Sequence, residues 1–250
     1  MANNKVEIEN NLTLIRSLIT KHKRHDHIFA GVGMFIIISL TITLLVLFLD
    51  LVFDGYPRFN LDFLTNFPSR RATAAGILSA WVGSSLVLIV TFFAAVPLGI
   101  AAGVYLEEYA KKNWFSDLIE INVTNLAGVP SIIYGLLALG LFVYGFGLGQ
   151  TILTAGLTLA LLMLPIVIVA TREAIRAIPI HIREAAYAVG ATKWQVSLHH
   201  VIQYSYGGIL TGVIIGMARA IGETAPVITI GALTFIAFLP PSPVGLEPPF

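Results

Sequence analysis

The chain has 250 residues, of which 56% are hydrophobic and only 12% are charged, and its formal net charge is +1. Because average soluble domains contain roughly 25% charged residues, this composition predicts an all-α integral membrane protein and argues against a soluble enzyme. The chain contains no cysteine, which excludes disulfides and thiolate metal sites.

The sequence begins with 27 mostly polar residues, expected to form a cytoplasmic tail. Apolar residues recur there at helical spacing, so the tail is either an amphipathic piece lying on the bilayer or a frayed basic end. The apolar residues are Leu12, Ile15, Leu18 and Ile19, and the histidines nearby are His22, His25 and His27. These histidines stand among Lys, Arg and Asp without a rigid scaffold, so we expect a solvated flank and no metal site.

The remainder, 28–250, is predicted to be one transmembrane domain with five apolar segments. Each segment reaches the ~20 residues that a helix needs to cross the hydrocarbon core. The segments are 28–53, 74–106, 118–144, 151–170 and 206–239. Five crossings would place 240–250 at the start of an external loop, and we expect a sixth helix to be missing.

The distribution of Lys and Arg predicts a cytoplasmic N-terminus, because positively charged loops stay inside. With that orientation 11 of the 15 basic residues are cytoplasmic and three are external. The external three are Arg58, Arg70 and Arg71, and Arg219 lies within a membrane segment. The polar stretch 171–205 is then cytoplasmic.

This polar stretch is predicted to form a helix, a sharp turn and a second helix. Pro179 suits a helix start, and an apolar face follows at i, i+3, i+4 and i+7, made of Ile182, Ala185, Ala186 and Val189. Gly190 suits a left-handed helix end, and Thr192 with Gln195 has capping-box spacing. Small residues with Arg183, Glu184 and Lys193 at the rim suit docking into a partner's groove. The alternative is a hairpin that only covers the bundle.

The fifth segment carries two charges on a face of glycines. At about 100° per residue, Arg219 and Glu223 fall in the same sector as the glycines, which are Gly208, Gly212 and Gly216. Glycines every fourth residue permit close helix packing, and charges at i, i+4 can pair. A charge at bilayer depth is costly, by ~2.5–3.5 kcal/mol for Arg, and normally faces a cavity or a partner.

Glu184-Ala185-Ala186, followed after three residues by Gly190, resembles the EAA loop of ATP-binding-cassette importer permeases. In that family the loop forms a coupling helix that docks onto the ATPase subunit. The family pattern has a proline where this chain has Gln203, so the loop departs from the pattern at its exit.

Two further motifs resemble the phosphate-uptake permeases of the PstA kind. They are 128–135, Gly-Val-Pro-Ser-Ile-Ile-Tyr-Gly, and 218–226, Ala-Arg-Ala-Ile-Gly-Glu-Thr-Ala-Pro. The resemblance implies a type I importer permease bundle in a bacterial inner membrane. It also implies a second, PstC-like permease, two ATPase subunits and an extracytoplasmic phosphate-binding protein, with lipid but no nucleic acid as a further partner.

Within this resemblance the glycine face is expected at the interface of two permease subunits, where Arg219 would contact the passing anion. Arg suits phosphate because its planar fork bonds two oxygens, and Glu223 would keep it from trapping the anion. A purely structural ion pair is the alternative. Arg172 is a second candidate anion contact, or else an anchor whose charge reaches the membrane interface.

The chain is predicted not to be an enzyme. It lacks a Gly-x-x-x-x-Gly-Lys-Ser/Thr phosphate loop, so it needs no cofactor itself, and ATP with Mg²⁺ would reside on the partner ATPase. An importer of another oxyanion, such as sulfate or molybdate, remains open. An ion-driven secondary transporter is a further alternative, although no inverted repeat is visible.

Overall fold

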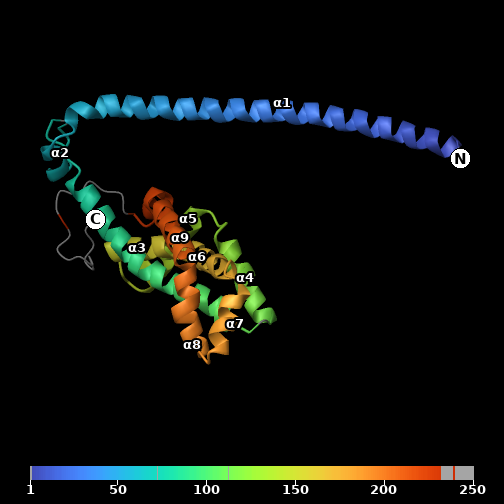
Figure 1. The fold of residues 1–250 in the computed structure, drawn as a ribbon. Helices are drawn as coiled ribbons and strands as arrows, with labels where there is room; N and C mark the ends of the chain where they lie inside the picture. The colour runs from blue at the N-terminus through green and yellow to red at the C-terminus, as the bar shows by residue number, and fades with distance from the viewer. Residues whose placement is uncertain (1, 72, 112, 232–238, 240–250) are drawn as a thin grey trace. The chain divides into compact units, whose positions relative to one another are not determined.

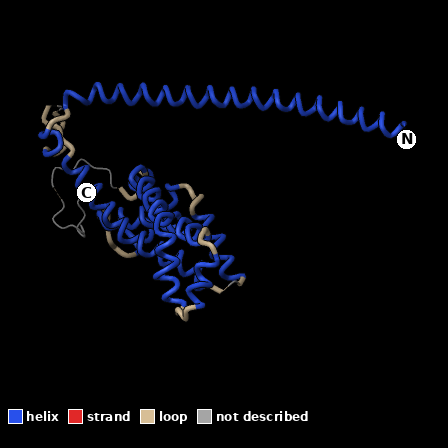
Figure 2. Tube along the Cα trace, in the orientation of Figure 1, coloured by secondary structure: helices blue, strands red, loops and turns tan. Residues whose placement is uncertain are grey.

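A computed structural model describes residues 2–71, 73–111, 113–231 and 239. The chain divides into two units, residues 1–61 and residues 62–250. The described part is built of helices joined by short loops (Figure 2).

The first unit consists of α1 (Ala2–Gly55) and a 3₁₀ turn, η1 (Tyr56–Arg58). The predicted segment 28–53 lies inside α1, which confirms the first helix. Its apolar stretch is exposed throughout in this chain, as expected for a helix whose surroundings are lipid or other subunits. The amphipathic pattern expected at Leu12 to Ile19 lies outside the described side chains.

The second unit is a bundle centred on α6 (Ile152–Arg176). Along one side of α6 lies α3 (Leu78–Val104), and along another lies α9 (Ile202–Gly222) (Figure 1). Small and medium apolar residues from all three helices form the core; they are Ala95, Val96, Ala160, Met163, Val167, Ile209 and Val213. The fourth predicted segment, 151–170, is therefore the most buried helix of the bundle.

Short elements surround these three helices. A short helix, α2 (Leu61–Thr65), precedes α3, and a π-helical turn, η2 (Tyr105–Tyr109), ends it. The others are α4 (Trp114–Leu126), α5 (Ser131–Ala138), η3 (Leu139–Gly145), α7 (Ile180–Ala188), α8 (Lys193–Val196), η4 (Ser197–Val201) and α10 (Ala225–Thr229); η3 and η4 are π-helical.

The third predicted segment is not one continuous helix. The pair α4 and α5–η3 is bent by 104° around residues 127–130. Pro130 disfavours helical backbone at Val129, so the helix stops and a new one begins after the proline. The Tyr134 hydroxyl donates to the carbonyl of Leu126 over 2.7 Å and thus satisfies a carbonyl freed by the break.

The fifth predicted segment is also interrupted. The helix α9 ends at Gly222, and Glu223 takes an extended conformation. Pro226 explains the stop, because a continued helix would set its ring against the carbonyl of Gly222. The rest of the predicted segment includes 232–238, which lie outside the described residues, as does the expected external loop. Among the described residues four helices are long and apolar enough to cross a membrane, or five spans if the bent pair counts as one.

Candidate functional site: the helix–turn–helix and the membrane charges

The polar stretch forms a helix, a turn and a second helix, as predicted. The first helix, α7, begins after Pro179, and Gly190 has a φ of +84°, the left-handed conformation expected there. Thr192 and Gln195 make both bonds of the capping box that opens α8. The connecting segment is shorter than predicted, because α6 continues to Arg176 and the next long helical run begins at Lys193.

The inner side of this element packs on the ends of the membrane helices. Its buried residues form one apolar cluster, made of Ile175, Ile178, Ala186, Val196 and Val201. Of the predicted apolar face, only Ile182 and Ala186 pack in this way, whereas Ala185 is exposed. Val189 is 84% exposed, because it follows the last helical residue and the chain turns away there. The predicted apolar face was therefore confirmed for Ile182 and Ala186 and wrong for Ala185 and Val189.

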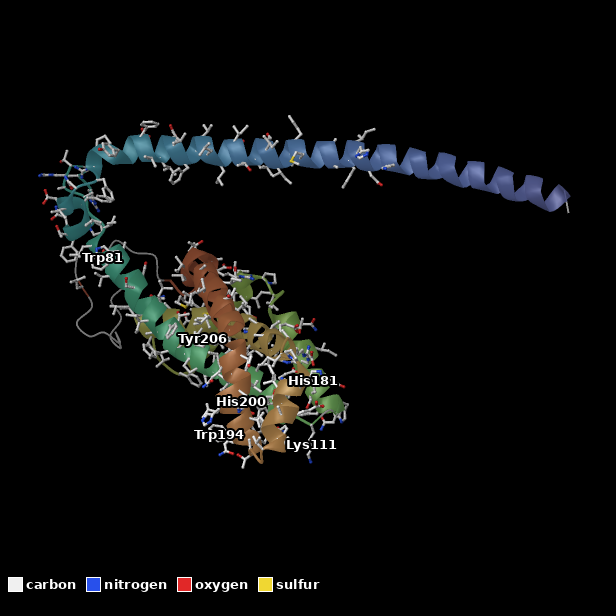
Figure 3. The ribbon with its side chains drawn as sticks, in the orientation of Figure 1. Trp81, Lys111, His181, Trp194, His200 and Tyr206 are labelled. Atoms are coloured by element: carbon white, nitrogen blue, oxygen red, sulfur yellow. The ribbon has the colours of Figure 1, made fainter. Side chains whose placement is uncertain are left out.

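The element also exposes several apolar residues beside its charged and polar ones. Besides Ala185 and Val189, it exposes Ile180 and Trp194, with Trp194 65% exposed. Glu184 is also exposed and its carboxylate lies 3.4 Å from the His181 ring. Figure 3 shows His181, Trp194 and Lys111 at the same end of the second unit, away from Trp81. Both loops rich in basic residues therefore lie on one side of the bundle.

Arg183 does not lie on the outer rim where it was expected. Its guanidinium turns inward and donates to the Glu108 carboxylate at the end of α3, with the shorter nitrogen–oxygen distance 2.9 Å. The same group donates to the carbonyls of Ile175 and Ile178. Arg183 thus joins the helix–turn–helix to the membrane domain.

Arg172 lies in a group of ion pairs near the end of α6. Its side chain is 7% exposed and pairs with Glu107 at 3.4 Å and Glu120 at 2.6 Å. Arg176, one turn later, reaches the same two carboxylates at 2.9 and 3.1 Å. Two arginines of α6 and two carboxylates, one from η2 and one from α4, thus form one ion-pair cluster.

Glu107, Glu108 and Glu120 had not been singled out from the sequence. The available signal was an acidic pair at the end of one apolar segment and basic residues at the end of another. If both ends lie at the same membrane level, such opposite charges are expected to pair.

The glycine face of α9 packs against α6 of the same chain, with Gly212 and Gly216 buried and Gly208 still exposed. A Cβ added at Gly208 would lie 2.7 Å from the Cβ of Ala174, and Gly212 meets Ala170 in the same way. Gly216 lies over Met163. The three glycines therefore allow α9 to pack closely against α6 of the same chain; their expected place at an interface between two permease subunits stays a prediction.

Arg219 and Glu223 form the expected pair, with 3.5 Å between the Arg219 Nε and a carboxylate oxygen. The pair bridges the end of α9, because Glu223 lies just beyond the last helical residue. Arg219 remains 45% exposed and Glu223 20% exposed. At 3.5 Å the contact is long for a hydrogen bond, and among the described residues it engages only the Nε of a guanidinium that carries five N–H donors.

The two motifs that were most specific in the sequence meet in space. A Cβ on Gly135 would collide with the Thr229 hydroxyl and would lie 2.8 Å from the Cα of Pro226. The breaks in both helices, at 127–130 and at 223–224, therefore belong to one packed junction of α5 with α10.

Residues 95–243 match the family described as binding-protein-dependent transport system inner membrane component. The chain belongs to this family. The matched region contains α6, the helix–turn–helix and the Arg219–Glu223 pair. Its members are permease subunits of ABC transporters that work with other subunits, and the chain is accordingly a multi-pass inner membrane protein.

Several curated proteins are similar to the chain. A protein of Bacillus subtilis (strain 168) named "Probable ABC transporter permease protein YqgI" is 31% identical over 204 residues, which are 81% of this chain and 69% of that protein. The phosphate transport system permease protein PstA of Yersinia pestis is 31% identical over 89% of this chain and 77% of its own length. The protein of the same name from Mycobacterium leprae is 40% identical over 63% of this chain and 51% of its own length.

Proposed function

We propose that the chain is the transmembrane permease subunit of an ABC importer of inorganic phosphate, forming half of the pathway. The names of the Yersinia pestis and Mycobacterium leprae relatives support phosphate as the cargo. The observation that carries the proposal is the helix–turn–helix, with an inner side fixed to the membrane helices and apolar residues left exposed on its open side.

The open side is the proposed docking surface for a separate ATPase subunit. An amphipathic helix held against the bundle by Ala186 exposes Glu184 and Ala185, and Val189 is exposed just beyond its end; this suits the helix-in-groove mode of recognition. The sharp turn at Gly190 fixes the direction of the second helix relative to the first. ATP and Mg²⁺ would bind on the ATPase, so this chain would need no cofactor.

Docking of this kind requires the helix–turn–helix to be cytoplasmic. The Lys and Arg census supports that orientation, with the N-terminus on the same side. The common location of Lys111, His181 and Trp194 at one end of the second unit agrees with it.

Arg219 is the proposed contact of the anion with this subunit, and Glu223 limits how tightly the anion is held. The exposure of the guanidinium and the 3.5 Å length of its contact to Glu223 support this role. Replacing Arg219 with Gln should abolish most phosphate uptake while the subunits still assemble. Uptake unchanged from wild type in an assembled R219Q complex would make the pair structural.

The complete importer would contain this chain, a second PstC-like permease, two ATP-binding subunits and an extracytoplasmic phosphate-binding protein. The decisive experiment reconstitutes that complex and measures ATP hydrolysis with binding proteins loaded with phosphate, sulfate or molybdate. Stimulation by the phosphate-loaded protein alone supports the proposal. Stimulation by sulfate-loaded or molybdate-loaded protein instead would reassign the cargo to that oxyanion.

A further inference from the structure

Two neighbouring carboxylates at the end of α3 have different partners. Glu107 pairs with Arg172 and Arg176 of α6, whereas Glu108 pairs with Arg183 of α7. Both glutamates lie in the π-helical turn η2. A π-helical turn holds more residues than an α-helical turn, so adjacent side chains diverge less and both can face the α6–α7 side. Such turns are frequent at functional sites.

The Glu108–Arg183 pair is well shielded from solvent. The two side chains are 7% and 17% exposed, and the carboxylate oxygen accepts from Nε at 3.1 Å and from an Nη at 2.9 Å. Charge-assisted bonds with two donors from one guanidinium are both strong and directional. The pair therefore holds α7 in a fixed position relative to the end of α3.

The same guanidinium also reaches α6. It donates to the carbonyl of Ile175 in α6 at 3.1 Å and to that of Ile178 just beyond α6 at 3.2 Å. One side chain thus ties α7 to the ends of two of the three long helices of the bundle, α3 and α6. The opposite side of α7 and its turn is open, with Val189 exposed.

We propose that Arg183 and Glu108 are positioning residues that transmit displacement of α7 into α3 and α6, and so couple ATP hydrolysis to transport. The inference rests on the proposed function, because α7 is displaced only if an ATPase docks there. A partner that moves α7 also moves Arg183, whose guanidinium donates two hydrogen bonds to Glu108 and two to the carbonyls of Ile175 and Ile178. These four bonds are the joint between α7 and the membrane helices. Without the joint, the apolar contacts of Ala186 and Ile182 still hold α7 on the bundle but no longer direct its motion.

The test uses the complete complex in proteoliposomes and four versions of this chain: wild type, Glu108→Gln, Arg183→Gln and the double variant. The readouts are copurification of the ATPase subunits, basal ATP hydrolysis, and phosphate taken up per ATP hydrolysed. We expect copurification and basal hydrolysis near wild type, and uptake per ATP lowered about tenfold, within the ~5–150-fold range of ordinary coupling energies. Because the residues act as a pair, the double variant should be no worse than the poorer single variant.

Glu173→Gln is the matched control. It removes the same charge from a neighbouring carboxylate that is 64% exposed and pairs with Arg176, so uptake per ATP should stay near wild type. Arg183→Lys keeps the charge but loses the fork and should recover only part of the uptake.

Uptake per ATP unchanged in Glu108→Gln would overturn the inference, and so would loss of ATPase copurification, which would assign the pair to docking. Additive losses in the double variant would show two independent roles and also contradict it. A wild-type complex without ATP-dependent phosphate uptake would instead refute the proposed function, so the two failures are distinguishable.

Discussion

Replacing Gly208 with alanine should push α9 away from α6. The added Cβ would lie 2.7 Å from the Cβ of Ala174, and the Ala174 Cα is also near, at 3.5 Å. Carbon atoms in contact rest at ~3.5–4.0 Å, so the helices would have to separate by about 1 Å at this level. Overpacking of this kind typically costs ~1–3 kcal/mol of the free energy of unfolding.

Gly207 provides the matched control for this prediction. It lies on the same helix, and no described atom lies within 4 Å of a Cβ added there. Glycine-to-alanine exchange raises helix propensity by ~1 kcal/mol at either position, so this gain cancels in the comparison. The free energy of unfolding of Gly208→Ala should thus be about 1–3 kcal/mol below that of Gly207→Ala.

The assay is thermal unfolding of the purified complex in detergent, followed by helical circular dichroism. Adding Ala174→Gly to Gly208→Ala removes the opposing methyl group and should recover most of the lost melting temperature. Equal melting temperatures for the two single alanine variants would refute the reasoning. Failure of Ala174→Gly to restore stability would show that the cost of Gly208→Ala arises elsewhere.

Two further glycines lead to predictions of the same kind. Gly135→Ala should lower the melting temperature, because the added methyl group collides with Thr229 and Pro226. Gly140→Ala is the control, since nothing described lies within 4 Å of its added Cβ, and it should leave the melting temperature unchanged. Equal melting temperatures for the two variants would contradict the close packing of α5 on α10. Gly190→Ala forces a non-glycine residue to a φ of +84° at a cost of ~1–2 kcal/mol, so binding-protein-stimulated ATP hydrolysis should fall, and less for Gly190→Asn. Unchanged hydrolysis in Gly190→Ala would show that the direction of this turn does not matter for coupling.

Local signals predicted the helix–turn–helix well. Each of these signals depends only on residues close by in the sequence. They are Pro179, Gly190 and the Thr192–Gln195 capping box, and the structure places all of them as expected. The same locality explains why the first and fourth membrane helices were found, since a long apolar run needs no knowledge of its neighbours.

The interruptions of the third and fifth segments were missed because hydropathy does not register them. The hydropathy of a broken span and of a continuous helix is the same, so the break at 127–130 leaves no mark in it. Only Pro130 and Pro226 indicated the two breaks. Membrane helices often tolerate proline, so the prolines alone could not settle the point.

The partners of charged and small residues depend on tertiary packing. A helical wheel placed the glycines of α9 on one face, but it could not show that α6 packs against that face. Likewise Arg183 and Glu108 are 75 residues apart in sequence, and their pairing follows from the meeting of α3, α6 and α7. Sequence reasoning therefore assigned Arg183 to the outer rim when it belongs to the inner joint.

On the proposed function, this chain moves phosphate only together with a separate ATPase that docks on its helix–turn–helix. The most direct measurement is uptake of radiolabelled phosphate into proteoliposomes, with the ATPase subunits present or omitted. We predict uptake that requires ATP, the binding protein and the ATPase subunits, and that fails when Val189 and Trp194 on the open surface are replaced with Asp. Phosphate uptake by this chain alone, driven by an ion gradient and insensitive to those replacements, would contradict the account.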